Sequence, residues 1–324
     1  MKTDLKNKKV TVVGLARSGL AAALLLKELG AEVYATDSGN SEDLIKSKLL
    51  LEGKGVNVEI GAHSRGFIEE KDLVVVSPGV AENASALRWA REDRIPLISE
   101  IELGYLCCAA PIVAVTGTNG KSTTASLIGD VLRAGGKDVV VCGNIGNPFC
   151  AEMSKIKKNS VVVLEVSSFQ LENIKYFRPY VSVALNISQN HFDRHPDLDA
   201  YLNAKAKIFH NQSEDDWAVL NGDDPLVKGL ESKTKARVVF FSREAKERAY
   251  FRDGSMFISN GAIEEFVCEA SELKIKGGHN VDNVLACLCV ASIFGVSCAK
   301  AAGAIKAFNG LEHRFEYVTS INGV

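Results

Sequence analysis

Residues 112–129 read "IVAVTGTNGKSTTASLIG", an apolar strand followed by a glycine-rich turn and the start of a helix. The strict phosphate loop is GxxxxGKS/T, and here Val115 stands where its first glycine belongs. The other parts are present: amides that could cradle phosphates, a lysine for the β- and γ-phosphates and a hydroxyl for Mg²⁺. They are Gly117, Thr118, Asn119, Gly120, Lys121, Ser122 and Thr123. Because a strand precedes the turn and a helix follows it, the pattern favours ATP binding over an ordinary glycine-rich turn.

Apolar strands alternate with helical segments on both sides of this stretch. Before it we expect strands at 8–14, 31–37, 72–79 and 95–99, helices at 18–29 and 85–93, and a short helix with a hinge near residue 109. From residue 111 onward we expect strands at 111–117, 137–143, 160–167, 180–188 and 216–224, with helices at 121–134 and 199–211. Continuous apolar strands in βαβ order predict an α/β fold with parallel sheets. Residues 236–276 alternate in short segments, which predicts a small antiparallel sheet, and residues 281–308 return to helices.

Composition and charge exclude several classes of protein. The 324 residues are 46% apolar with a net charge of -2, which gives no general attraction to nucleic acid or to an anionic membrane. The most apolar run, residues 284–299, is shorter than the about 20 residues of a membrane span, so we expect one buried helix there and no membrane insertion. Eight cysteines without a CxxC pair, and an N-terminus unlike a secretory signal, indicate reduced thiols in a cytoplasmic protein.

A second glycine turn, "GLARSG" at residues 14–19, follows the first expected strand. A dinucleotide fingerprint would be GxGxxG, but Ala16 replaces its middle glycine. Asp37 ends the next strand, where it could reach a ribose or a base, and the helix start at Ser18 offers amides to a phosphate. Nicotinamide binding and a purely structural turn both remain open, and the diphosphate of another nucleotide fits better.

Three side chains could carry chemistry, two at the ends of central strands and one on a helix. Glu165 ends a buried strand, so its carboxylate needs a partner, either a metal ion facing the phosphate loop or a structural hydrogen bond. His191 follows another strand at the carboxyl end, where ligands gather in α/β sheets, although a lone histidine is more often structural. Lys205 falls within the apolar stripe of a helix. A desolvated lysine amine could add CO₂ to form a carbamate that binds metal, or the side chain could snorkel to solvent.

Two asparagines and an arginine occur late in the chain. Asn280 and Asn283 lie three residues apart at a helix start and share a face, so they could cap the helix or read a base edge. Arg314 could hold a phosphate or a ribose.

Together these pieces resemble the Mur ligases of peptidoglycan synthesis. The segments "TGTNGKST", "LEVSSFQLE", "NHFDRH", "AKAKIF", "GGHNVDN" and "HRFE" match the family in order. At the N-terminus, "VVGLARSGLA", "VVSPG" and "SEIELG" resemble the branch that adds D-glutamate. The resemblance implies a Rossmann-like domain at 1–108 for a UDP precursor, a P-loop-type ATP-binding central domain at 109–310 with the small antiparallel sheet, and a linker at 311–324 to an absent third domain.

The family's activity implies roles for the residues named above. ATP would activate the carboxylate of UDP-N-acetylmuramoyl-L-alanine as an acyl phosphate, which the amine of D-glutamate then attacks. The resemblance implies two Mg²⁺ ions, one held by Ser122 and Glu165 and one by His191 and carbamylated Lys205, with Lys121 on the ATP phosphates. Asn280, Asn283 and Arg314 would hold the nucleoside of ATP. The UDP precursor would meet Arg17, Ser18, Asp37, Ser38, Gly79, Asn144, Ser167 and Gln170.

The main departure from the family is length. The family's third domain carries the D-glutamate site and part of the ATP site. We therefore expect this chain to be a monomeric fragment that binds the UDP precursor, binds ATP weakly, and by itself ligates very slowly or not at all. Alternatives are a sister Mur or folylpolyglutamate-type ligase, a non-catalytic nucleotide-sugar-binding module, and a nicotinamide oxidoreductase. Ala16 and the second phosphate loop argue against the last of these.

Overall fold

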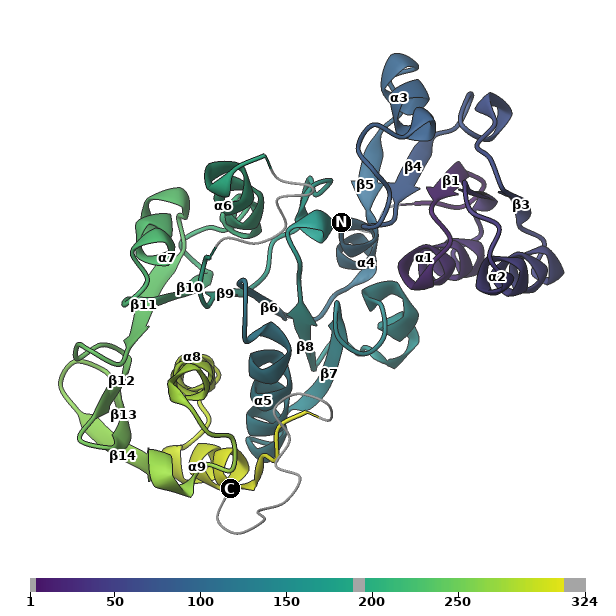
Figure 1. Cartoon of the computed structure of the whole chain (residues 1–324). Coiled ribbons are helices and arrows are strands. Elements are labelled where there is room, and N and C mark those ends of the chain that lie inside the picture. Colours follow the sequence, from purple (N-terminus) through teal and green to yellow (C-terminus); the bar gives the residue numbers. More distant parts are fainter. Residues whose placement is uncertain (1–3, 189–195, 312–324) are drawn as a thin grey trace, which may run out of the picture.

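The computed structural model describes residues 4–188 and 196–311 and contains two sheets, joined by α4 (Figure 1). The N-terminal sheet is parallel, with strand order β3-β2-β1-β4-β5. Its elements are β1 (Lys9–Val13), α1 (Arg17–Glu28), β2 (Glu32–Asp37), α2 (Glu42–Gly53), β3 (Asn57–Ile60), η1 (Arg65–Phe67), β4 (Leu73–Val76), α3 (Ser85–Glu92) and β5 (Leu97–Ser99). This sheet has the predicted Rossmann-like α/β form.

The second sheet has the strand order β14-β13-β12-β11-β10-β9-β6-β8-β7. Its strands are β6 (Ile112–Thr116), β7 (Asp138–Gly143), β8 (Ser160–Glu165), β9 (Val181–Ala184), β10 (Trp217–Asn221), β11 (Arg237–Ser242), β12 (Ala249–Arg252), β13 (Ser255–Ser259) and β14 (Glu264–Glu269). The helices are α4 (Glu100–Cys107), α5 (Lys121–Ala134), α6 (Leu198–Ala206), α7 (Pro225–Gly229), α8 (Gly278–Ile293) and α9 (Cys298–Ala307). Short 3₁₀ segments are η2 (Phe149–Lys155), η3 (Phe169–Leu171), η4 (Lys207–Phe209), η5 (Leu230–Lys233) and η6 (Ala270–Glu272).

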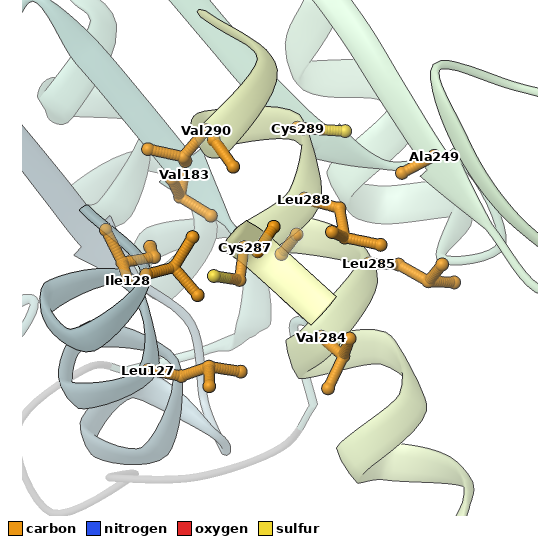
Figure 2. Packing of buried hydrophobic residues seen from close by; sticks show 14 of the residues in the cluster. Leu127, Ile128, Val183, Ala249, Val284, Leu285, Cys287, Leu288, Cys289 and Val290 are labelled. Atoms are coloured by element: carbon orange, nitrogen blue, oxygen red, sulfur yellow. The ribbon is translucent and has the colours of Figure 1, made fainter. Parts of the chain in front are cut away.

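Both faces of the central sheet are covered, because side chains of successive strand residues point to opposite faces. On β6, Val113 and Val115 enter the core under α5, α8 and α9, whereas Ile112 and Ala114 enter the core on the other face. Figure 2 shows the first of these cores, where Leu127 and Ile128 of α5 lie near Val183 and the apolar side chains of α8. A strand buried on both faces reads as a continuous apolar run, which is the pattern seen in the sequence.

The connecting helix α4 belongs to the cores of both bodies. Leu103 is buried in the core of the N-terminal sheet, and Ile101 is buried in the second core of the central sheet. The backbone N–H of Ser99, at the start of α4, donates to the carbonyl of Asn173 in the central body at 2.8 Å. The two bodies therefore meet along a packed helix at the position where a hinge was expected.

The structure differs from the sequence analysis at three places. The pair α2 and β3 was not predicted, because α2 buries only Leu51 and exposes Leu49, so it has no clean apolar stripe. The strands β12 to β14 pair antiparallel as expected, but β11 is parallel to β10 and to β12, so this ribbon extends the central sheet. The run 284–299 is not one helix, because α8 ends at Ile293 and Gly295 turns the chain with φ +71° before α9.

The cysteine side chains are free thiols, and five of the eight are buried. None of the eight cysteines forms a disulfide. Within the described residues, no helix is both long and apolar enough to cross a membrane.

Candidate functional site

The phosphate loop connects β6 to α5, as its sequence predicts. Lys121 is the first residue of α5, and Gly120 before it has φ +82°, a conformation that favours glycine. A Cβ on Gly120 would also lie only 2.3 Å from the Asn283 side-chain oxygen. Val115, at the position of the missing glycine, is a buried residue inside β6, so the turn itself starts later. The Lys121 amine donates to the carbonyl of Thr118 at 2.8 Å.

Glu165 lies at the end of β8, directly beside Val115 of β6. The residue is 1% exposed, and one carboxylate oxygen accepts a hydrogen bond from the Asn144 side-chain amide at 2.8 Å. The second oxygen is buried and has no hydrogen-bond partner in the described part of the chain. A buried acceptor without a partner is costly, and a cation would supply one.

A Mg²⁺ ion at this oxygen fits the donor set that the loop offers. No group of three or more His, Cys, Asp or Glu side chains that could hold a metal occurs among residues 4–188 and 196–311. Mg²⁺ does not need such a group, because it is usually held by one or two carboxylates together with the phosphates of a nucleotide. Glu165 supplies such a carboxylate, and the buried Ser122 hydroxyl adds the oxygen ligand that a phosphate loop offers to Mg²⁺.

Lys205 is buried on α6, with 2% of its surface exposed. Its amine donates to the carbonyl of Gly117 at 2.9 Å and lies 4.6 Å from the ring centre of Tyr201. Burial, with a smaller contribution from the positive charge of Lys121, lowers the pKa of Lys205 to about 7, while Glu165 opposes the change. The amine therefore does not snorkel to solvent, and a substantial part of it is unprotonated at neutral pH.

The two late asparagines connect α8 to α5. Asn283 accepts a hydrogen bond from the Thr124 hydroxyl at 3.0 Å and donates to the Asn280 side chain at 3.0 Å. Asn280 in turn donates to the carbonyl of Lys276 at 2.8 Å. Through these bonds the asparagines hold the start of α8 against α5, beside the phosphate loop. That they also contact the base of ATP stays a prediction. His191 and Arg314 lie outside the described residues.

A cavity of about 580 Å³ lies between the two bodies. Seven of the eight residues predicted for the UDP precursor line it: Arg17, Ser18, Asp37, Ser38, Gly79, Asn144 and Gln170. Ser167 is not among the lining residues, and its backbone N–H donates to the side-chain oxygen of Gln170 at 3.0 Å. The fold thus brings together a site from both bodies, and Ser167 contacts it through its hydrogen bond to Gln170.

The glycine turn at the cavity is held by side chains at strand ends. The Asp37 carboxylate accepts the backbone N–H groups of Leu15 at 2.7 Å and Gly39 at 2.8 Å. Ser77 donates its hydroxyl to the carbonyl of Gly14 at 2.7 Å. The Arg17 guanidinium donates to the carbonyl of Gly146 in the central body, so a contact spans the two bodies next to the cavity.

His63 also lines the cavity and was not predicted from the sequence. Its Nδ1 lies 2.8 Å from the Thr36 hydroxyl oxygen, and that hydroxyl donates to the Glu59 carboxylate at 2.7 Å. Because the carboxylate only accepts, the Thr36 hydroxyl proton goes to Glu59, and Nδ1 of His63 donates to the Thr36 oxygen. The sequence feature that could have indicated His63 is its position just after β3, at the carboxyl edge of the sheet, where ligands bind in α/β folds.

Asn144 connects the cavity to the phosphate loop. Asn144 lines the cavity, and its side-chain amide donates to Glu165 at 2.8 Å. A ligand in the cavity and a cation at Glu165 would therefore both lie next to one amide group. This arrangement can bring a carboxyl group in the cavity close to a nucleotide phosphate on the loop.

Two family models match the chain. The Mur ligase middle domain matches residues 115–291, and the Mur ligase MurD-like N-terminal domain matches residues 8–99. The chain is 41% identical to a UDP-N-acetylmuramoylalanine–D-glutamate ligase of Thermoanaerobacter pseudethanolicus, over 99% of the chain and 71% of that protein. It is 42% identical to the protein of the same name from Pelotomaculum thermopropionicum, over 100% of the chain and 72% of that protein.

Solved structures of related ligases have the same fold. The UDP-N-acetylmuramate:L-alanyl-γ-D-glutamyl-meso-diaminopimelate ligase of Neisseria meningitides has a TM-score of 0.63 at 21% identity, covering 95% of this chain and 100% of that chain. The UDP-N-acetylmuramate-alanine ligase of Thermotoga maritima has a TM-score of 0.58 at 24% identity, covering 98% of this chain and 72% of that chain.

Proposed function

The chain belongs to the Mur ligase family of ATP-dependent C–N ligases in peptidoglycan synthesis. We propose that it supplies the precursor-binding and ATP-binding parts of a ligase that joins D-glutamate to UDP-N-acetylmuramoyl-L-alanine, since it matches 71% of the length of a ligase with that name. The observation that carries this proposal is the double role of Asn144, which lines the cavity and holds Glu165 beside the phosphate loop. A UDP precursor in the cavity would present its alanine carboxylate to the γ-phosphate of ATP. The carboxylate would become an acyl phosphate, and the amine of D-glutamate would displace phosphate from it.

Within this proposal the phosphate loop binds and orients ATP. The loop amides and Lys121 would hold the β- and γ-phosphates, which is the work that phosphoryl transfer requires of a protein. Ser122 and Glu165 would hold one Mg²⁺ ion, and His191 with Lys205 as a carbamate would hold a second. These ions would supply positive charge to the phosphoryl group in transfer. A partly unprotonated Lys205 amine supports the carbamate, because the neutral amine is the form that adds CO₂.

The N-terminal body would hold the UDP group. The start of α1 at Arg17 and Ser18 offers backbone amides and a positive helix dipole to a diphosphate. Asp37 and Ser38, at the end of β2, would meet the nucleoside. Asn280, Asn283 and Arg314 remain our proposed contacts to the nucleoside of ATP.

We also propose the domain division 1–108, 109–310 and 311–324, and a cytoplasmic monomer. The extents of the two matched family models support the first two domains. Eight free thiols support a reducing compartment.

Calorimetric titration with UDP-N-acetylmuramoyl-L-alanine tests the precursor site. We expect saturable binding that is clearly tighter than for UDP-N-acetylmuramate, UDP-glucose or NADH, and loss of the preference in Asn144→Ala. Equal binding of UDP-N-acetylmuramate would favour a sister ligase. Preference for NADH would refute the proposed function.

A further inference from the structure

The phosphate loop is paired to the segment that follows β9. The ladder between β6 and β9 continues past both strands, because the backbone N–H of Leu185 donates to the carbonyl of Thr116 at 3.1 Å. One step further, the N–H of Thr118 donates to the carbonyl of Asn186 at 2.9 Å. The start of the loop, up to Thr118, is thereby hydrogen-bonded as if β6 and β9 continued beyond their carboxyl ends.

The side chain of Asn186 extends this pairing by one more residue. Its Oδ1 accepts the backbone N–H of Asn119 at 2.8 Å, and its Nδ2 donates to the backbone carbonyl of Asn119 at 3.1 Å. A primary amide carries a donor and an acceptor side by side, so it can satisfy both backbone groups of one residue. The Asn119 peptide groups are in this way fixed by a residue that is 67 positions away in the sequence.

Asn186 is itself anchored from the side of β10. The carbonyl of Leu185 accepts a hydrogen bond from the buried Asn221 side chain at 2.9 Å. The N–H of Ile187 donates to the Asp224 carboxylate at 2.8 Å. The backbone on both sides of Asn186 is therefore held from the end of β10. At Asn119, the contact between the sheet and the loop is made by the Asn186 side chain.

We propose that Asn186 is a positioning residue for ATP, one that holds the Asn119 peptide in the phosphate-binding conformation before the nucleotide arrives. This inference rests on the proposed function, since it requires that the loop bind phosphates. A loop that is ordered in advance loses less conformational entropy on binding. The two hydrogen bonds between Asn186 and Asn119, called the Asn186 clamp below, would therefore raise the affinity for ATP without touching it. The clamp should therefore affect both the dynamics of the free loop and the affinity for ATP.

Amide hydrogen exchange and calorimetry on the same variants test the inference. In Asn186→Ala, exchange at Asn119 should accelerate in the free protein, while exchange at Thr118, whose N–H donates to the backbone carbonyl of residue 186, should change little. Mg²⁺–ATP should bind roughly tenfold more weakly, the effect of losing two neutral hydrogen bonds. Asn211→Ala is the matched control, because that half-buried side chain also donates to two backbone carbonyls, of Lys175 and Phe177, away from the loop. It should change neither measurement.

Asn186→Asp separates positioning from general destabilisation. The aspartate keeps the acceptor for the Asn119 N–H, so part of the exchange protection should return, whereas its negative charge should keep ATP binding weak. Unchanged exchange in Asn186→Ala, or faster exchange with unchanged ATP affinity, would overturn the inference. If the unaltered chain bound no ATP while Asn119 still depended on Asn186, the proposed function would fail and the positioning role with it.

Discussion

Replacing Glu100 by glutamine should stabilise the protein at alkaline pH and leave its stability nearly unchanged at acidic pH. Glu100 is fully buried at the start of α4, where one carboxylate oxygen accepts the backbone N–H of Cys150 at 2.6 Å. The other oxygen has no hydrogen-bond partner within the described residues. Burial raises the pKa of Glu100 from 4.5 to about 7, against the smaller opposing effect of hydrogen bonds from Cys150 and Phe149.

The raised pKa of Glu100 determines the sign of the effect. Between pH 4.5 and about 7 the folded protein keeps a proton on Glu100 that the unfolded chain has released. The stability that this proton contributes is present below pH 4.5 and is lost as the pH rises through about 7. Since one pKa unit corresponds to about 1.4 kcal/mol, the loss amounts to about 3 kcal/mol above the folded-state pKa. Glutamine stays neutral and keeps the oxygen that accepts the Cys150 N–H, so the variant avoids this loss.

Urea unfolding near pH 5 and near pH 8.5 measures the effect. We expect the free energy of unfolding of Glu100→Gln to exceed that of the unaltered chain by about 3 kcal/mol near pH 8.5, and by much less near pH 5. Glu102→Gln is the control on the same helix, because the buried Glu102 carboxylate accepts three backbone N–H groups at 2.7 to 2.9 Å. Its replacement should destabilise the protein near pH 8.5 by about 3 kcal/mol, since hydrogen bonds to a charged group are strong. The same gain for Glu100→Gln at both pH values, or a loss like that of the control, would refute the reasoning.

Three further predictions concern the two ligand sites. His63→Ala should weaken binding of the UDP precursor roughly tenfold and leave ATP binding intact in calorimetry, because one polar cavity contact is removed; equal loss at both sites would point to misfolding. Gly120→Ala should abolish ATP binding and lower the melting temperature, since its Cβ would lie 2.3 Å from the Asn283 side-chain oxygen. Gly136→Ala is the control, because Gly136 also has a positive φ of +87° but no atom within 4 Å of the new Cβ, so it should cost only about 1 kcal/mol of backbone strain. Similar effects of both variants would contradict the steric account. Glu165→Gln should keep the fold by circular dichroism but reduce the Mg²⁺ dependence of ATP binding, and an unchanged dependence would show that this carboxylate does not serve the ion.

Much of the fold could be predicted because parallel strands that are buried on both faces are continuous apolar runs. The helix α5 has the predicted bounds, since its glycine start and its apolar spacing are local signals. The helix α2 was missed because its contacts with the sheet bury few of its apolar side chains. Residues 236–276 were expected to form a small antiparallel sheet, and its parallel connection to the central sheet was missed because no local signal reveals that β11 pairs with β10.

The sequence by itself determined the phosphate loop, because residues 112–123 carry the strand, the turn, the lysine and the hydroxyl in one contiguous stretch. It also placed Lys205 in an apolar stripe, but only the tertiary structure decided that the amine is buried against Gly117. The same holds for the Asn186 clamp on Asn119, the bond from Asn144 to Glu165 and the cavity between the two bodies. These partners meet because the strand order brings β9, β6, β8 and β7 side by side, with their carboxyl ends at one edge. A local pattern specifies the conformation of each strand but not its neighbours, so contacts between strand ends are set by the assembled sheet.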